Sequence, residues 1–146
     1  MIRPYTEADL YHVMQLWLTT NIDAHPFIAP SYWHNMYPLV KKMIPVAELY
    51  VYENDETAKI DGFIGLSEEH IEGIFVDEAS QSKTIGTQLL HHVKGRKRRL
   101  TLEVYQKNTR AIAFYKKEDF SIQDETLDRE TGEKAYYMSW NKPFTY

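Results

Sequence analysis

Apolar residues recur at helical spacing in two segments near the start of the chain. Thr6, with Asp9 three residues later, predicts an N-cap and a capping box. The helix that follows buries residues at positions i, i+3, i+4, i+7 and i+8, namely Leu10, Val13, Met14, Trp17 and Leu18. Ser31 is expected to cap a second helix, which ends at about Met43 because Pro45 cannot continue it. Its apolar side consists of Tyr32, Met36, Leu39, Val40 and Met43.

The rest of the chain alternates short apolar strands with two further helices. A turn at Asn54 separates the second and third strands, and Glu130 to Gly132 separates the last two. A third helix is predicted over residues 85–93, and a fourth follows Asn108 as its N-cap. The expected strands are residues 1–3, 48–53, 60–66, 71–76, 100–104, 120–127 and 135–140.

The order of these elements is β-α-α-β-β-β-α-β-α-β-β. Strands that follow one another pair as hairpins, whereas strands separated by a helix can pair in parallel, so a mixed sheet with helices on both faces is expected. No linker or repeat divides the chain. We therefore expect one α/β (α+β) domain over residues 1–146, with a sheet of six to seven strands.

Composition and charge remove several functional classes. The 17 basic and 21 acidic residues give a net charge of −4, which does not favour binding to nucleic acid or to an anionic membrane. The absence of cysteine excludes disulfides, thiolate zinc sites and a cysteine nucleophile. No cluster has convincing metal spacing, and no apolar run is long enough to span a bilayer. A cytoplasmic protein, monomeric or homodimeric, is expected.

One segment has the layout of an anion-binding loop. A buried strand ends at Asp77, a polar loop follows, and a helix opens near Thr84. The unpaired N–H groups at a helix start suit a pyrophosphate, and a glycine such as Gly86 lets the backbone approach a ligand closely. On these grounds alone, a purely structural strand-loop-helix is the better interpretation.

This segment resembles the acetyl-CoA-binding motif of the GNAT acetyltransferases, Gln/Arg-x-x-Gly-x-Gly/Ala after a strand. Gln81 and Gly86 match its first and last positions, but Thr84 stands where the family has glycine. Threonine disfavours a positive φ, although its hydroxyl can donate to a phosphate. The resemblance implies that the cofactor is held by Ile74, Phe75, Val76, Gln81, Ser82, Lys83, Thr84, Ile85, Gly86 and Thr87.

Residues 108–120 resemble a second GNAT signature, Asn-x-x-Ala-x-x-Phe-Tyr-x-x-x-Gly-Phe. Every specified position matches except the glycine, which is Asp119; aspartate tolerates the left-handed conformation of a helix C-cap. Other segments are similar to a bacterial GNAT subgroup described as protein-lysine acetyltransferases: Trp17-Leu18, His25-Pro26-Phe27-Ile28, Tyr32-Trp33, residues 102–108 and Met138-Ser139-Trp140. Residues 102–104 also resemble the ribosomal-protein alanine N-acetyltransferases.

The resemblance implies roles for residues outside the phosphate loop. Asn108 and Tyr115 are expected to bind acetyl-CoA, and Tyr115 to protonate the departing thiolate, although a half-buried helix tyrosine is the alternative. Glu103, and after it Glu72, is a candidate base or water relay, although strand carboxylates usually face solvent. The acceptor side is assigned to the aromatic residues His25, Phe27, Tyr32 and Trp33, for which packing is an equal alternative.

The function that this resemblance implies is transfer of an acetyl group from acetyl-CoA to a primary amine, on a protein lysine or an N-terminus. Two alternatives remain open. One is acetylation of a small-molecule amine, and the other is a CoA-binding module without turnover, with which Thr84 would be consistent. Five basic residues lie between Lys94 and Arg99, where a solvated loop is the expected interpretation.

Overall fold

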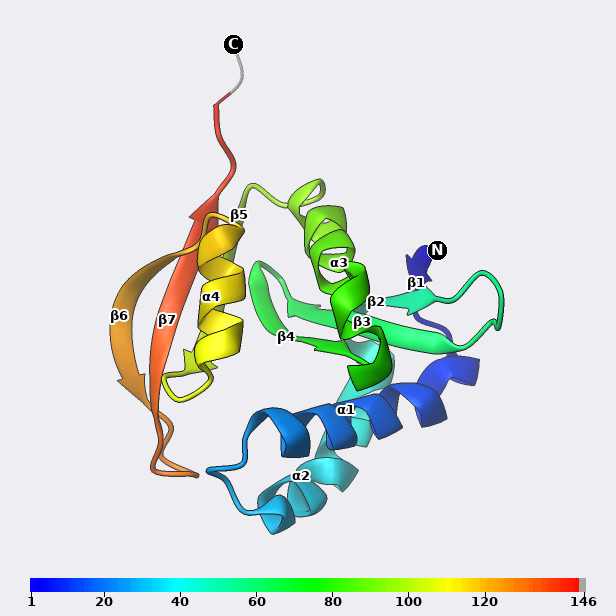
Figure 1. Cartoon of the computed structure of the whole chain (residues 1–146), viewed down its shortest axis with the longest axis horizontal. Helices are drawn as coiled ribbons and strands as arrows, with labels where there is room; N and C mark the ends of the chain where they lie inside the picture. The colour runs from blue at the N-terminus through cyan, green and yellow to red at the C-terminus, as the bar shows by residue number, and fades with distance from the viewer. Residues whose placement is uncertain (145–146) are drawn as a thin grey trace.

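Seven strands and four α-helices follow one another in the predicted order in the computed structural model of the chain (Figure 1). The structure describes residues 1–144, and for residues 81–83 only the backbone. The helices are α1 Leu10–Ala24, α2 Pro30–Met43, α3 Ile85–Lys94 and α4 Thr109–Lys117. The strands are β1 Ile2–Pro4, β2 Glu48–Glu53, β3 Ile60–Ser67, β4 His70–Val76, β5 Arg99–Tyr105, β6 Ser121–Leu127 and β7 Lys134–Asn141. Short 3-10 turns cover Glu7–Asp9, Ile44–Val46 and Glu78–Lys83.

The sheet is mixed, as expected, and its strands run in the order β1-β2-β3-β4-β5-β7-β6. Every neighbouring pair is antiparallel except β4 and β5, which are joined through α3 and run parallel. The register between β4 and β5 contains only two pairs, His70 with Thr101 and Ile71 with Leu102. Beyond these pairs the two strands diverge, so the sheet opens at its centre into two halves.

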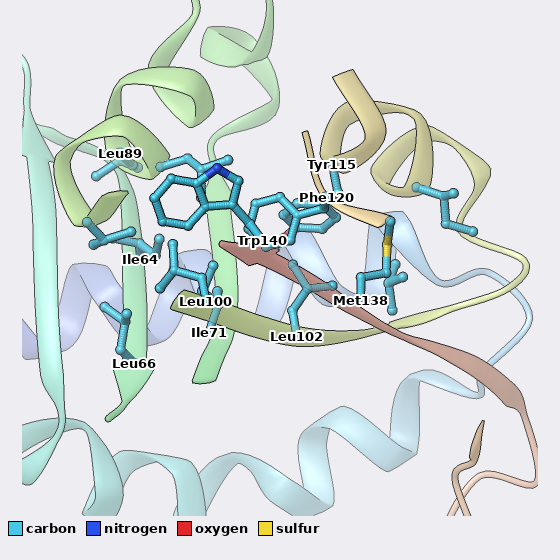
Figure 2. Close-up of a cluster of buried hydrophobic side chains, with 14 of the residues drawn as sticks. Ile64, Leu66, Ile71, Leu89, Leu100, Leu102, Tyr115, Phe120, Met138 and Trp140 are labelled. Carbon is cyan, nitrogen blue, oxygen red and sulfur yellow. The ribbon is translucent and has the colours of Figure 1, made fainter. Parts of the chain in front are cut away.

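Two hydrophobic clusters cover the two faces of the sheet. Alternation along β2 divides its side chains, with Leu49 and Val51 in one cluster and Tyr50 and Tyr52 against the other. The cluster that includes α3 and α4 joins both halves of the sheet, through residues such as Ile64, Leu100 and Trp140 (Figure 2). The other cluster packs α1 and α2 onto β2 and β3. The prediction of helices on both faces is therefore confirmed.

Most predicted helix ends are confirmed, and one cap is wrong. The Thr6–Asp9 capping box forms, with the Thr6 N–H donating to Asp9 Oδ2 at 2.8 Å. Ser31 does not cap α2, because the helix starts one residue earlier at Pro30 and Ala29 is the cap. Proline suits the first helical position, because its fixed φ is already helical. The N–H that it lacks would have had no partner within the helix.

The end of α4 confirms the expectation for Asp119. Its φ is +70°, in the left-handed region. The Asp119 N–H donates to the Lys116 carbonyl at 3.1 Å, and the Phe120 N–H donates to the Tyr115 carbonyl at 3.0 Å. These two hydrogen bonds form a Schellman motif. The helix therefore ends at the same residue and in the same way as it would with the usual glycine at this position.

Candidate active site

The divergence of β4 and β5 opens a cleft of about 1580 Å³. Its walls come from both strands, from the starts of α3 and α4, from the connection between α1 and α2, and from the turn between β6 and β7. The cleft brings together residues from nearly the whole length of the chain. Of the predicted site residues whose side chains the structure describes, all except Ile85 line it.

The side of the cleft where the resemblance places the cofactor is formed by Ile74, Phe75 and Val76 of β4 and by Thr84, Gly86 and Thr87 around the start of α3. Ile85 is the exception, because its side chain lies in the core with 2 % exposure and only its backbone can serve a ligand. The predicted contacts of the Gln81, Ser82 and Lys83 side chains lie outside the described residues. The N–H groups of the first turn of α3 remain suited to an anion.

Thr84 adopts the left-handed backbone conformation that glycine, the residue of the family motif at this position, reaches most readily. Its φ is +63°, although threonine disfavours a positive φ. The residue ends the Glu78–Lys83 turn and serves as the cap of α3, where the Gln88 amide donates to the Thr84 hydroxyl oxygen at 3.2 Å. The tight connection is therefore kept with a β-branched residue, at a cost in backbone strain.

Tyr115 lies on α4, where its ring packs in the core against Phe114 and Phe120. The residue is 8 % exposed and also lines the cleft. Burial raises the pKa of its hydroxyl far above the ordinary value of tyrosine. No hydrogen bond to another described residue contributes to this shift. Tyr115 therefore remains protonated at neutral pH, as a proton donor must.

Asn108 is the N-cap of α4, as predicted. Its Oδ1 accepts the Ala111 N–H at 3.2 Å, which satisfies one of the unpaired donors of the first helical turn. Its Nδ2 lies 3.4 Å from Nε2 of His25, a residue that follows α1. One side chain thus contacts both sides of the cleft.

An aromatic cluster surrounds His25 at the acceptor end of the cleft. Its ring stacks on Trp33 at 5.2 Å between centroids, and it meets the edges of Phe27 and Tyr105 at 5.6 and 5.1 Å. Tyr32 packs on Trp33 at 4.9 Å. The predicted group is therefore brought together. Trp33 also packs on Trp17 and is 7 % exposed, so that it serves the core and the cleft at once.

Two tyrosine–carboxylate hydrogen bonds tie the turn between β6 and β7 to the aromatic cluster. The Tyr105 hydroxyl donates to Asp128 Oδ2 at 2.6 Å, and the Tyr32 hydroxyl donates to Glu130 Oε2 at 2.9 Å. Burial, together with the adjacent carboxylate, raises the pKa of Tyr32 to about 12 and that of Tyr105 further. Both hydroxyls therefore remain donors, and the contacts hold the turn beside α2 (Figure 1).

The two candidate bases lie on the strands that diverge. Glu103 is exposed into the cleft from β5, and its Oε2 accepts the Thr126 hydroxyl at 3.2 Å. Glu72 is the extra residue of a β-bulge, because Gly65 pairs with Gly73 and Leu66 pairs with Ile71. A bulge turns a side chain away from the regular alternation, and Glu72 also lines the cleft. Both carboxylates thus line the same cleft.

The sequence analysis missed the carboxylates of the turn and the contribution of Tyr105. Tyr105 lies two residues after Glu103 on one strand, so the period of two could have placed both on the same face. Asp128 and Glu130 carry no such signal, because their partners lie 23 and 98 positions away. Among the described residues, no group of three or more His, Cys, Asp or Glu side chains is arranged to hold a metal ion.

None of the helices in the described part of the chain has the length and apolar content needed to cross a membrane. The basic segment, residues 94–99, is largely solvated, as expected, because Arg96, Arg98 and Arg99 are exposed, whereas Lys94 and Lys97 are half-buried. The Lys97 ammonium donates to Glu48 at 2.8 Å, and the Lys94 ammonium donates to the Glu118 carbonyl at 2.6 Å. These lysines stabilise contacts within the fold.

Comparison with known proteins supports the resemblance at the level of sequence and fold. Residues 45–122 match the family model of the acetyltransferase (GNAT) domain. The chain is 36 % identical over 142 residues to the peptidyl-lysine N-acetyltransferase YiaC of Escherichia coli K12, covering 96 % of each chain. It superposes on the apo form of YjaB from Escherichia coli with a TM-score of 0.85 at 24 % identity, covering 98 % of each.

A further solved structure contains the cofactor that the resemblance implies. The PaiA N-acetyltransferase of Thermoplasma acidophilum, in complex with coenzyme A, has a TM-score of 0.81 to the chain at 16 % identity, covering 97 % of this chain and 98 % of that one. The match of the family model, the close relative over almost the whole length, and the open centre of the sheet agree. The chain belongs to the GNAT family and is an acetyl-CoA-dependent N-acetyltransferase.

Proposed function

We propose that the chain acetylates the ε-amine of lysine in peptides or proteins. The observation that carries this proposal is the acceptor end of the cleft, where an aromatic cluster faces carboxylates at the surface. Aromatic rings suit the apolar stem and the cation of a lysine side chain, and the carboxylates Glu72, Glu103, Asp128 and Glu130 attract its ammonium form. The 36 % identity to YiaC, named as a peptidyl-lysine N-acetyltransferase, supports the same acceptor.

Acetyl-CoA is proposed to bind between β4 and β5. The pyrophosphate would accept hydrogen bonds from the N–H groups at the start of α3, beside Gly86 and Thr87. The pantetheine would follow β4 from Val76 toward Ile74. The short register between β4 and β5 supports this position, because a strand that diverges from its neighbour leaves room for a ligand beside it. Backbone N–H groups near the thioester can then polarise its carbonyl.

In the proposed transfer, the neutral amine attacks the thioester carbonyl carbon, the C–S bond breaks, and an amide forms. Glu103, or Glu72, accepts the proton of the amine through a water molecule, as both carboxylates are exposed in the cleft. Tyr115 donates a proton to the thiolate, since its hydroxyl is protonated at neutral pH and lines the cleft. These residue roles follow from the second GNAT signature and the lining of the cleft.

The acceptor is tested by comparing three classes of amine under one assay. Free-CoA release and mass spectrometry would be measured with lysine peptides whose N-terminus is blocked, with peptides whose N-terminus is free but which lack lysine, and with small polyamines. We expect the blocked lysine peptides to have the highest kcat/KM. Faster turnover of polyamines or of free N-termini would contradict the proposal, and acetyl-CoA binding without turnover would favour a binding module.

The proposed setting is the cytoplasm of a bacterium, where acetyl-CoA is available to an enzyme of this kind. A chain without cysteine is consistent with a reducing compartment. Localisation of a tagged chain in fractionated cells would test this setting.

A further inference from the structure

A continuous series of hydrogen bonds connects α1 with α4 through His25. The His25 Nδ1 lies 2.9 Å from the Asn21 carbonyl oxygen, in the last turn of α1. The His25 Nε2 lies 3.4 Å from Asn108 Nδ2, and the Asn108 Oδ1 accepts the Ala111 N–H at 3.2 Å. The series thus begins at the end of one helix and ends in the first turn of another, and its His25–Asn108 contact joins residues 83 positions apart.

The partners fix the proton positions along this series. A carbonyl oxygen only accepts, so Nδ1 of His25 carries the proton and donates to Asn21. The Asn108 Oδ1 is identified by the N–H that it accepts, so Nδ2 is the donor that faces His25. Nε2 must then be the acceptor, which requires a neutral imidazole. Burial lowers the pKa of His25, which favours the same neutral form.

This series of hydrogen bonds joins the two sides of the cleft at a place where β4 and β5 no longer pair. The β4 and β5 strands share two register pairs, so the main chain holds the two halves together only at the closed end. At the open end, His25 belongs to the aromatic cluster of the acceptor side, and Asn108 caps the helix that carries Tyr115 seven residues later. The side chains therefore connect acceptor and cofactor sides directly.

We propose that His25 is a positioning residue for acetyl transfer, whose neutral imidazole holds the Asn108 side chain and thereby aligns α4 and Tyr115 with the acceptor site. The proposal rests on the proposed role of Tyr115 as proton donor. An acceptor that packs on the aromatic cluster would contact the ring of His25, and this contact would be transmitted to the N-cap of α4. Protonation of His25 would break the series, because Nε2 and Asn108 Nδ2 would both carry hydrogens.

The surroundings of His25 leave the Asn108 amide as its main polar partner on the cleft side. The rings of Trp33 from α2, Phe27 from the α1–α2 connection and Tyr105 from β5 pack around it. The charged groups beyond these rings are Asp128, bound to the Tyr105 hydroxyl, and Lys107, whose Nζ lies 5.5 Å from the Phe27 ring and pairs with Glu133. No charged group is among the causes of the lowered pKa of His25.

The contact itself is tested by titrating the His25 ring by NMR in the full chain. The Asn108→Asp variant retains an oxygen that can cap α4, but it places a carboxylate where Nε2 meets the amide. We expect the pKa of His25 to rise by about one unit or more, because an adjacent opposite charge favours the imidazolium. The Asn108→Ser variant also caps the helix, without a charge, and should not show this rise. An unchanged titration in folded Asn108→Asp would overturn the proposal.

The effect on catalysis is tested with a matched pair at position 25. In His25→Gln, the side-chain Oε1 can occupy the position of Nε2 and accept a hydrogen bond from the Asn108 amide. In His25→Asn, the shorter side-chain amide reaches only the position of Nδ1. Both variants lose the ring, so packing losses are similar. With acetyl-CoA and a lysine peptide at saturation, we expect kcat to fall about tenfold in His25→Asn and less than about threefold in His25→Gln.

Equal kcat in the two variants, or a change confined to the acceptor KM, would contradict a positioning role. The titration and the kinetics separate this proposal from the proposed function. An inactive wild-type chain would count against the acceptor assignment, whereas the NMR shift in Asn108→Asp depends only on the contact between His25 and Asn108.

Discussion

Burial keeps two ionisable side chains of the cleft in their neutral forms. The Tyr115 hydroxyl has its pKa raised and the His25 imidazole has its pKa lowered, in both cases because the charged form would lose its hydration. A neutral tyrosine is a proton donor, and a neutral histidine can accept the Asn108 N–H. At the scale of single residues, desolvation therefore favours the protonation state that each proposed role requires.

The role of Tyr115 as an acid predicts a loss of turnover without a loss of stability. In Tyr115→Phe the ring still packs against Phe114 and Phe120, and the hydroxyl has no partner among the described residues to lose. We expect kcat to fall about tenfold or more, because general acid catalysis contributes at least this much, whereas the melting temperature and the Kd of acetyl-CoA remain close to wild type.

The measurement is kcat at saturating acceptor, together with calorimetric binding of acetyl-CoA and thermal unfolding. Tyr136→Phe serves as a matched control, since Tyr136 packs against the same core from β7 but does not line the cleft. Wild-type turnover in a folded Tyr115→Phe variant would remove this residue from the mechanism, and solvent would then protonate the thiolate.

At the scale of elements, two helix ends carry the backbone conformations that glycine usually supplies. Asp119 ends α4 with a φ of +70°, and Thr84 precedes α3 with a φ of +63°. Aspartate reaches this region more readily than threonine, whose branched Cβ crowds the backbone. Both elements are therefore positioned as in the family pattern, but Thr84 stores strain at the edge of the cofactor site.

Relief of this strain predicts that Thr84→Gly stabilises the fold. We expect the free energy of unfolding to rise by about 1 kcal/mol, the order of the cost of a left-handed conformation for an L-residue. Acetyl-CoA should bind more tightly, because the loop can then close further on the pyrophosphate. Chemical denaturation and calorimetry measure the two effects.

Thr84→Ala is the control, because it removes the hydroxyl and the branch but retains a Cβ at positive φ. It should recover less of the stability than glycine does. Weaker binding of acetyl-CoA in both variants would show that the hydroxyl contributes directly to the cofactor, and a glycine variant less stable than wild type would refute the strain argument.

In the whole molecule, side-chain contacts hold together the two halves of the sheet where the main chains of β4 and β5 no longer pair. The core beneath α3 and α4 joins the two halves, because Ile64 of β3 and Ile71 of β4 belong to the same cluster as Leu100 of β5 and Trp140 of β7 (Figure 2). At one edge, Lys94 of α3 donates to the end of α4 and lies 5.1 Å from the Trp140 ring. The opposite edge is the cleft, where a ligand can bind both halves.

A ligand that bridges both halves only in the folded chain should raise its stability. At a concentration of 100 times its Kd, acetyl-CoA is expected to add about 2.7 kcal/mol to the free energy of unfolding. For a chain of this size the melting temperature should rise by about 5–10 °C. Differential scanning calorimetry across a ligand series, with ATP as a phosphate-bearing control, measures the effect. The absence of any shift at millimolar acetyl-CoA would contradict binding in the cleft.

The sequence by itself determined the order of the elements and indicated the residues proposed for the cofactor side of the site. Hydrophobic periodicity and capping are local, so the order of strands and helices, the capping box at Thr6 and the left-handed Asp119 could all be predicted from neighbouring residues. Two family signatures, each contained within about twenty residues, indicated Gly86, Asn108 and Tyr115 in the same way. The cap of α2 was predicted wrongly at Ser31, because Pro30 is itself a favourable first helical residue.

Only the tertiary structure decided how these local pieces meet. It brought His25 to Asn108 and Tyr32 to Glu130, and it turned Glu72 into the cleft through a bulge. The cleft that these residues line opens where the parallel pair β4–β5 stops pairing. Such contacts join residues up to 98 positions apart, and no period or spacing along the chain encodes them, because they follow from packing in three dimensions.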